Sequence, residues 1–231
     1  MKQAIILTML ILPACTLKKI EPQAQVIKSS ATSRQVRVAS NKVRAEFLIS
    51  ENGIGSARLG MTLGELKQIS DQDTKFELMS PFTIDSNAIA VSKDGIVQYY
   101  ILYKTDVTSA PEEFVPTDSD LITSLMTDNY NYQTVEGIKV GTPIQQAEEI
   151  YGDATLAYNQ EGESREYVTF GDQGTSNIRF RASYYKLISD GLGFSGIYPE
   201  YPGVSYTTDK YQADAAIAAI EVTCTQESCL N

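Results

Sequence analysis

The stretch Ala57-Arg58-Leu59-Gly60-Met61-Thr62-Leu63-Gly64-Glu65-Leu66 decides the fold, because it occurs a second time as Ile138-Lys139-Val140-Gly141-Thr142-Pro143-Ile144-Gln145-Gln146-Ala147. The two copies are offset by 81 residues. Both read as an apolar residue, a base, an aliphatic residue and a glycine, followed by a helix start. A repeat at a fixed spacing indicates a duplicated structural unit.

Each copy carries signals for the entry into a short helix. Thr62 with Glu65 forms a capping-box pattern, and Thr142 with Gln145 repeats it, with Pro143 at the first helical position. The glycine of each copy predicts a backbone bend between an extended segment and the helix. Apolar residues then recur at helical spacing, which predicts one buried stripe on each helix.

A β-hairpin is predicted after each helix. The first joins strands at 88–92 and 96–103 through Lys93-Asp94-Gly95, and Asp-Gly is a strong hairpin signal. The second joins 167–170 to 176–184, and its alternating side chains predict a half-buried antiparallel strand. Further strands are expected at 44–50 and 215–223, and a short helix at 121–126.

These elements predict an α+β fold of two related lobes, each a short helix packed on a small antiparallel sheet. The expected division of the chain is a signal peptide at 1–14, a lipidated N-terminus and basic tether at 15–43, lobe 1 at 44–110, a connector at 111–134, and lobe 2 at 135–231.

The glycine-to-helix step with its hairpin resembles small envelope lipoproteins of the outer-membrane-assembly accessory type. The tandem arrangement resembles the β-lactamase-inhibitory-protein fold, and 135–143 resembles sigma-E-regulated lipoproteins of unknown function. The matching residues, Gly60-Met61-Thr62 and Gly141-Thr142-Pro143, are helix-entry residues. The resemblance implies a non-catalytic, protein-binding role at the cell envelope, and it carries over no active-site residues.

The N-terminus predicts export and lipidation. A lysine, an apolar run at 4–12 and Leu12-Pro13-Ala14-Cys15 have the pattern of a secretory signal that ends in a bacterial lipobox. The run is about half the roughly 20 residues that a membrane-spanning helix needs. Cys15 is the expected site of the diacylglyceryl group and palmitate anchor, and Thr16 favours the outer membrane facing the periplasm. The alternative is an ordinary secreted protein in which Cys15 is incidental.

The other two cysteines, Cys224 and Cys229, are an even set, and in an oxidising compartment we expect them to form a disulfide. Two free thiols or half of a metal site are the alternatives. The chain contains no histidine, and with so few ligands we expect neither a metal nor a cofactor.

Charge is segregated along the chain, whose net charge is −10. Residues 16–44 carry seven bases and one acid, or +6, whereas residues 45–231 carry 11 bases and 28 acids, or −17. One interpretation is that the basic tether lies against anionic head groups or cell-wall polymer. The other is that its charged residues only keep the tether soluble. The acidic remainder repels nucleic acid, so we expect no such partner.

The sequence argues against an enzyme. Without histidine there is no Ser-His-Asp or Cys-His arrangement. Ser195 lies in a near match to the nucleophile-elbow pattern, but Ile197 replaces its final glycine. Ser183 and Lys186 match Ser-x-x-Lys at a strand end, so a serine-lysine hydrolase is the least favoured hypothesis. The carboxylate pairs fall in polar, loop-like stretches, at 71 and 73, 112 and 113, and 118 and 120.

Two binding surfaces are predicted. The first is a Tyr- and Gly-rich loop, since tyrosine is enriched in binding surfaces, and its candidate residues for an envelope protein partner are Phe194, Tyr198, Tyr201, Tyr206 and Tyr211. Alternatively, these rings pack back on their own sheet. The second is the strand face with Arg179 and Arg181, for a cell-wall or small ligand. The leading hypothesis is a protein-binding envelope lipoprotein that uses this loop or the groove between the lobes, and the alternative is a ligand-binding module.

Overall fold

The computed structural model describes residues 44–105, 114–160, 165–173, 176–183, 187–188, 191–199 and 203–225. The predicted signal peptide, Cys15 and the tether lie outside these residues. No helix in the described part of the chain is long and apolar enough to cross a membrane.

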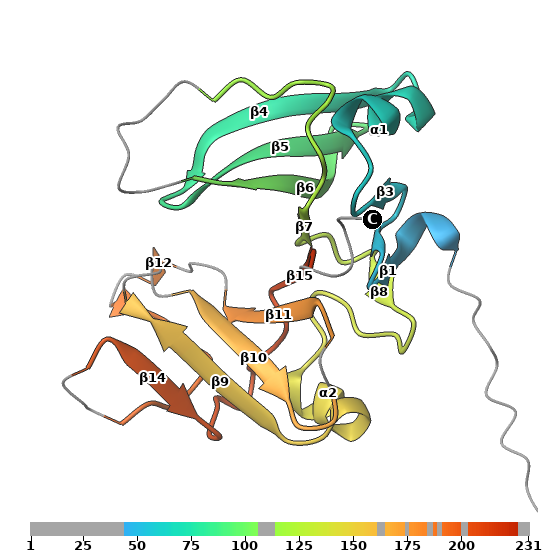
Figure 1. Ribbon diagram of the computed structural model, residues 1–231. Helices are drawn as coiled ribbons and strands as arrows, with labels where there is room; N and C mark the ends of the chain where they lie inside the picture. Colours follow the sequence, from blue (N-terminus) through green and yellow to red (C-terminus); the bar gives the residue numbers. More distant parts are fainter. Residues whose placement is uncertain are drawn as a thin grey trace, which may run out of the picture. The chain divides into compact units, whose positions relative to one another are not determined.

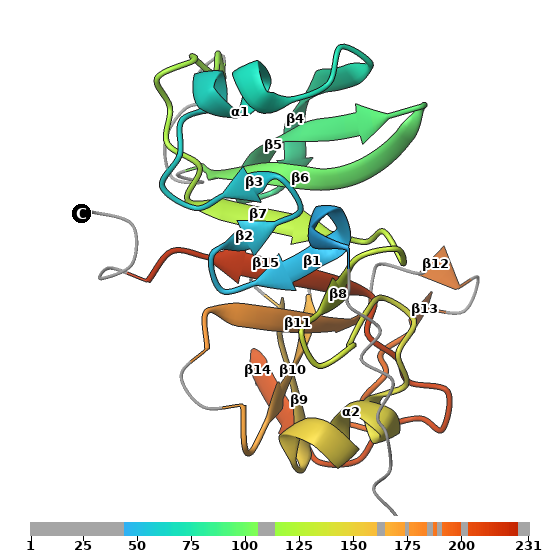
Figure 2. The same ribbon diagram turned by 90° about the vertical axis from the view of Figure 1, so that its right-hand side faces the viewer.

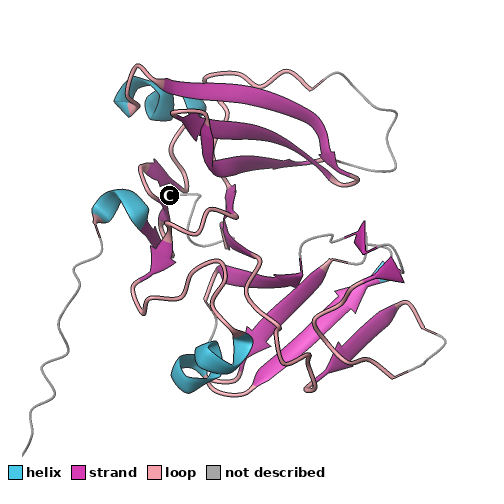
Figure 3. Cartoon of the chain, turned by 180° about the vertical axis from the view of Figure 1, so that it is seen from behind, coloured by secondary structure: helices cyan, strands magenta, loops and turns pink. Residues whose placement is uncertain are grey.

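The protein is mostly β (Figure 3). The predicted α+β class, with a helix on a separate small sheet in each of two lobes, is wrong. The two α-helices in the described part of the chain have only seven and eight residues, and the strands of both halves join in one nine-stranded sheet. They join because the central strands from the two halves pair with each other, so that neither half ends in its own sheet.

The nine-stranded sheet has the order β14-β9-β10-β11-β15-β7-β6-β5-β4. Its strands are β4 (Thr74–Thr83), β5 (Ser86–Lys93), β6 (Ile96–Lys104), β7 (Ser124–Thr127), β9 (Ala154–Asn159), β10 (Glu166–Phe170), β11 (Ile178–Ser183), β14 (Ser205–Thr208) and β15 (Ala219–Thr223). Every pairing within it is antiparallel. Figure 1 shows the sheet curling so that β4–β6 and β9, β10 and β14 face each other across an opening.

The remaining elements are short. A 3-10 helix at Ala45–Phe47 leads into β1 (Leu48–Ser50), which with β2 (Gly53–Ile54), β3 (Ala57–Arg58) and β8 (Gln133–Thr134) forms a four-stranded sheet. This sheet lies beside β7 and β15 in Figure 2. The strand predicted at 44–50 is therefore strand only in its second half. A separate hairpin joins β12 (Leu187–Ile188) to β13 (Gly191–Leu192).

The two halves of the chain have the same order of elements. Helix α1 (Leu63–Ile69) is followed by β4, β5 and β6, and α2 (Ile144–Tyr151) by β9, β10 and β11. The predicted hairpins are β5–β6 and β10–β11, whereas β4 and β9 were not predicted. At the first turn Asp94 and Gly95 have φ of 54° and 76°, as the Asp-Gly signal requires.

Equivalent hydrogen bonds hold the two helix entries. The Gly60 amide donates to the Ile122 carbonyl, and the Gly141 amide donates to the Ile217 carbonyl, both at 2.8 Å. Three residues later, the amides of Leu63 and Ile144 donate to the segments that precede β7 and β15. Both glycines have positive φ, 83° and 86°, which confirms the predicted bends.

Only the first helix has the predicted cap. The Thr62 side chain accepts from the Glu65 amide, and Glu65 accepts from the Thr62 amide, so this capping box is confirmed. In the second half the prediction is wrong: Pro143 is the N-cap residue and makes no side-chain cap, while the Thr142 hydroxyl accepts from the Lys139 amide. Thr142 thus stabilises the turn before the helix.

The helix predicted at 121–126 is a second error. Ser124–Thr127 is the buried strand β7, which pairs with β6 on one side and β15 on the other. A short apolar run fits a buried strand as well as a helix, and here its neighbours decide.

The core lies on one face of the nine-stranded sheet. Side chains from both halves meet there with the apolar residues of the helices, among them Leu63, Leu66, Ile144 and Ala147. The opposite face carries a small apolar cluster around Tyr100 and Met126, and beside it mainly polar side chains. This second face holds the candidate site.

Candidate functional site: a basic groove

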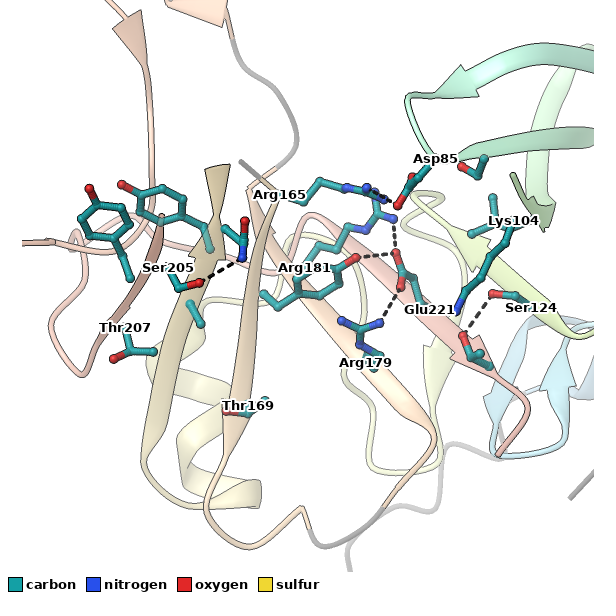
Figure 4. Close-up of a pocket in the computed structure, with 18 residues that line it drawn as sticks. Asp85, Lys104, Ser124, Arg165, Thr169, Arg179, Arg181, Ser205, Thr207 and Glu221 are labelled. Carbon is teal, nitrogen blue, oxygen red and sulfur yellow. Dashed lines mark hydrogen bonds and ion pairs between the residues drawn. The ribbon is translucent and has the colours of Figure 1, made fainter. Parts of the chain in front are cut away.

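The curled sheet encloses a groove of about 600 Å³ on the face that the helices leave open. This volume is typical of small-molecule sites, which span about 300–1,000 Å³. We call it the basic groove and define it by its charged residues, which are Lys104, Arg165, Arg179, Arg181, Asp85 and Glu221. They come from strands of both halves (Figure 4).

The groove is positive within an acidic protein. Four cations against two carboxylates leave +2, whereas the chain from residue 45 onward has −17. Like charges gathered on one concave surface attract a ligand of opposite charge, because a cleft focuses the field. The groove therefore favours an anionic ligand.

Glu221 is the centre of the charged cluster. It is buried on β15, opposite Arg179 in the ladder with β11, and forms an ion pair with Arg181, with both side chains 5% exposed. The Tyr167 hydroxyl lies 3.4 Å from Glu221 Oε1. The Arg181 Nε atom is buried and has no hydrogen-bond partner in the described part of the chain. A buried donor without an acceptor costs free energy, because the lost hydration is not replaced.

Arg179 and Lys104 are the accessible cations. The Arg179 side chain is 54% exposed, lies 3.9 Å from Glu221 Oε2, and stacks with its guanidinium carbon 4.1 Å from the centre of the Tyr167 ring. Stacking orients the guanidinium and leaves its N–H groups for other acceptors. Figure 4 shows Lys104 directed into the groove from β6. These two side chains are the first that an entering anion would meet.

Arg165 and Asp85 close one side of the groove. Arg165 Nη2 lies 2.6 Å from Asp85 Oδ2, and the Thr83 hydroxyl donates to Asp85 Oδ1 at 2.8 Å. Partial burial raises the pKa of Asp85, but the hydrogen bonds from Arg165 and Thr83 outweigh burial and hold this pKa below its usual value. Asp85 is therefore ionised at neutral pH and keeps Arg165 in place.

The structure brings together the two predicted ligand-binding residues, Arg179 and Arg181, on the groove face of β11. They differ in role, however. Arg181 is neutralised by Glu221, whereas Arg179 keeps half of its side chain in solvent. The sequence did not indicate this difference, because alternation along a strand does not show what lies on the neighbouring strand.

The predicted partner-binding aromatic residues fall into a packed cluster on the other face of the sheet. Tyr158 of β9 stacks with Phe194 at 4.0 Å and with Tyr206 at 4.7 Å between ring centres, and Tyr198 meets all three edge-on. The Tyr211 hydroxyl donates to Glu148 at 2.7 Å. Tyr201 lies outside the described residues. This geometry is the predicted alternative, in which the rings pack back on their own sheet, and the role in partner binding stays a prediction.

A buried carboxylate holds this loop. Glu166 of β10 is fully buried and accepts hydrogen bonds from the amides of Ser195 and Gly196 and from the Tyr198 hydroxyl, at 2.7–2.8 Å. Burial and the adjacent carboxylate raise the pKa of Tyr198. The Ser195 hydroxyl donates to the Ala182 carbonyl, so this serine has a structural role.

The other predicted sites do not converge. Asp71 pairs with Lys93, Asp118 with Lys67, and Asp120 accepts from Thr117. In the part of the chain that the structure describes, no three metal-ligating side chains come together. The Ser183 side chain, Lys186, Glu112 and Glu113 lie outside it. Cys229 does as well, and the disulfide with Cys224 stays a prediction.

Four of the six charged groove residues were not predicted from the sequence: Lys104, Arg165, Asp85 and Glu221. Only Glu221 carried a signal, as a carboxylate within the apolar run Ala215–Thr223 and therefore in need of a buried cation. The others lie at strand ends, where charged residues are ordinary.

No family model matches this sequence, and no curated protein matches it. Among solved structures, the chain is similar to the crystal structure of the uncharacterized protein YfeY from Escherichia coli. The two share 16% sequence identity with a TM-score of 0.44, and the match covers 76% of this chain and 99% of that one. This similarity assigns no function.

Proposed function

We propose that this chain is a non-catalytic binding protein whose basic groove holds an anionic ligand. The observation that carries the proposal is the +2 charge of the groove within a domain of −17. A surface that is basic by chance would not gather its cations from β6, β10 and β11 on one concave face. The lipobox-like N-terminus supports a location at the cell envelope, in keeping with a lipid-anchored module that binds a ligand outside the cytoplasm.

The packing of the cluster supports ligand binding over catalysis. Glu221 is held by Arg181 and Tyr167, and Asp85 by Arg165 and Thr83, so both carboxylates already accept hydrogen bonds or ion pairs. A general base needs a carboxylate that can reach a substrate proton. In this groove the carboxylates position the arginines, and the arginines and Lys104 meet the ligand.

The test uses tripolyphosphate as a compact polyanion, with binding measured by calorimetry on the full chain at low salt. The variant Lys104→Ala/Arg179→Ala removes the two accessible cations and should weaken binding at least tenfold, since charge-assisted hydrogen bonds contribute about 1.5–3 kcal/mol each. Lys139→Ala/Lys210→Ala is the matched control, because it removes the same charge from exposed positions outside the groove. Equal losses in both variants would show that the effect is one of net charge alone and would overturn the proposal.

A further inference from the structure

We infer that the ligand of the basic groove is an acidic saccharide, a short sugar chain that carries carboxylate or phosphate groups. This inference rests on the proposed function and adds the class of ligand. This class of ligand is indicated by the uncharged part of the groove lining, whose composition changes along the groove.

The cations of the groove lie on β6, on β11 and at the start of β10, and no lining residue of β9 or β14 is charged. Beyond Arg179 and Arg181, the lining across β10, β9 and β14 includes four hydroxyl and amide side chains, Thr169, Asn159, Ser205 and Thr207. The rings of Tyr158 and Tyr206 stack in the aromatic cluster on the other face. Eight strands contribute to the groove from β5 to β14, and at about 4.8 Å per step this is roughly 34 Å along the curved sheet. A ligand that fills the groove thus has an anionic part and a neutral polar part.

Hydroxyl and amide side chains both donate and accept hydrogen bonds, as sugar hydroxyls do. The Asn159 amide group donates to the Ser205 hydroxyl at 2.9 Å. Figure 4 shows Ser205 and Thr207 on β14. The side chains of Ser205 and Thr207 are exposed on the face that bounds the groove. They form a polar rim against which a chain of hydroxyl groups can be paired.

The floor of the groove argues against an extended peptide. Strands β9, β10, β11 and β15 are each bonded to a neighbour on both sides, so their backbone groups are used within the sheet. A peptide cannot add to this floor as a further strand, and its own amides would lack partners. Leu102 and Ala157 are the aliphatic residues of the lining.

The test compares two probes that carry the same three carboxylates, trigalacturonate and N-acetylated, C-amidated triglutamate. Calorimetry on the full chain should give at least tenfold tighter binding of trigalacturonate. The variant Ser205→Ala/Thr207→Val should remove most of that difference without changing the affinity for tripolyphosphate. Thr155→Val is the matched control, because Thr155 is an exposed threonine on the same face of β9 but outside the lining.

The outcomes separate this inference from the proposed function. Equal affinity for the two probes, or no effect of the Ser205→Ala/Thr207→Val change, overturns the saccharide assignment, while a loss with Lys104→Ala/Arg179→Ala still supports anion binding. Tighter binding of triglutamate overturns it in favour of an acidic protein partner. If Lys104→Ala/Arg179→Ala leaves the affinity for every probe unchanged, the proposed function itself fails.

Discussion

Arg165 and Asp85 form an ion pair of 2.6 Å across the opening of the curled sheet, although four strands separate β10 from β5 in the sheet order. Arg165 directly precedes β10, and Asp85 lies in the turn between β4 and β5. In a flat sheet, five strand steps of about 4.8 Å would hold these elements about 24 Å apart. The pair therefore exists only because the sheet curls, and it stabilises the curled form.

Asp85→Ala should lower the free energy of unfolding by about 1 kcal/mol, because Arg165 is 16% exposed and loses its counter-charge, while solvent at the half-exposed Asp85 screens the pair. Thermal unfolding should show a decrease of about 2–4 °C. Asp118→Ala is the control, since its pair with Lys67 is more exposed, and it should cost less than about 0.5 kcal/mol.

The stabilisation from Asp85 should depend on pH in the acid range. The pKa of Asp85 is lower in the folded protein than in the unfolded chain, where it is about 3.9. The stabilisation from Asp85 is therefore present above about pH 3.9 and is lost as the pH falls through the lowered pKa of the folded state. Unfolding of the parent and of Asp85→Asn should differ at pH 6, and the difference should shrink as the pH falls below the unfolded value of about 3.9. A difference that is as large at pH 2 as at pH 6 contradicts this assignment.

Glu221→Ala should destabilise the protein by about 3–5 kcal/mol, because it leaves the Arg181 guanidinium buried without a counter-charge. The double variant Glu221→Ala/Arg181→Met should recover much of this loss, since neither charge then remains buried. Chemical denaturation measures both. Arg179→Ala provides the comparison: it removes a half-exposed cation from the same carboxylate and should cost about 1 kcal/mol or less.

Glu166→Ala should release the loop at 193–199 from the sheet, because two backbone amides and the Tyr198 hydroxyl lose their acceptor. Limited proteolysis should then cut within this loop, and stability should decrease by about 3 kcal/mol or more. Tyr198→Phe keeps the ring in the aromatic cluster and removes only one hydrogen bond, so it should cost about 1–2 kcal/mol and leave the loop protected. Equal protection of the parent and Glu166→Ala would show that aromatic packing alone holds the loop.

The two helix entries should respond differently to loss of their predicted caps. Thr62→Ala removes a capping box and should cost about 1 kcal/mol. Gln145→Ala in α2, where the predicted cap does not form, should have little effect. Thermal unfolding distinguishes the two variants. Equal costs would indicate that Gln145 contributes to its helix in a way that the structure does not show.

The sequence by itself determined the features that depend on neighbours along the chain. It predicted two helices that begin after Gly60 and Gly141, the Asp94-Gly95 hairpin turn, and the alternation that places Arg179 and Arg181 on the same face of one strand. Each depends on backbone geometry or hydrogen bonds within a few residues, so the local sequence contains the necessary information. The segregation of charge along the chain was visible for the same reason.

Only the tertiary structure decided the fold class and the site. The run Ser124–Thr127 is a strand because β6 and β15 lie on either side of it, and β15 is about 95 residues away. Glu221 becomes the partner of Arg181, and Asp85 of Arg165, through pairings of the sheet that no local pattern encodes. Burial and ion pairing depend on what lies across the sheet, and for this reason the groove emerged only when the strands were placed together.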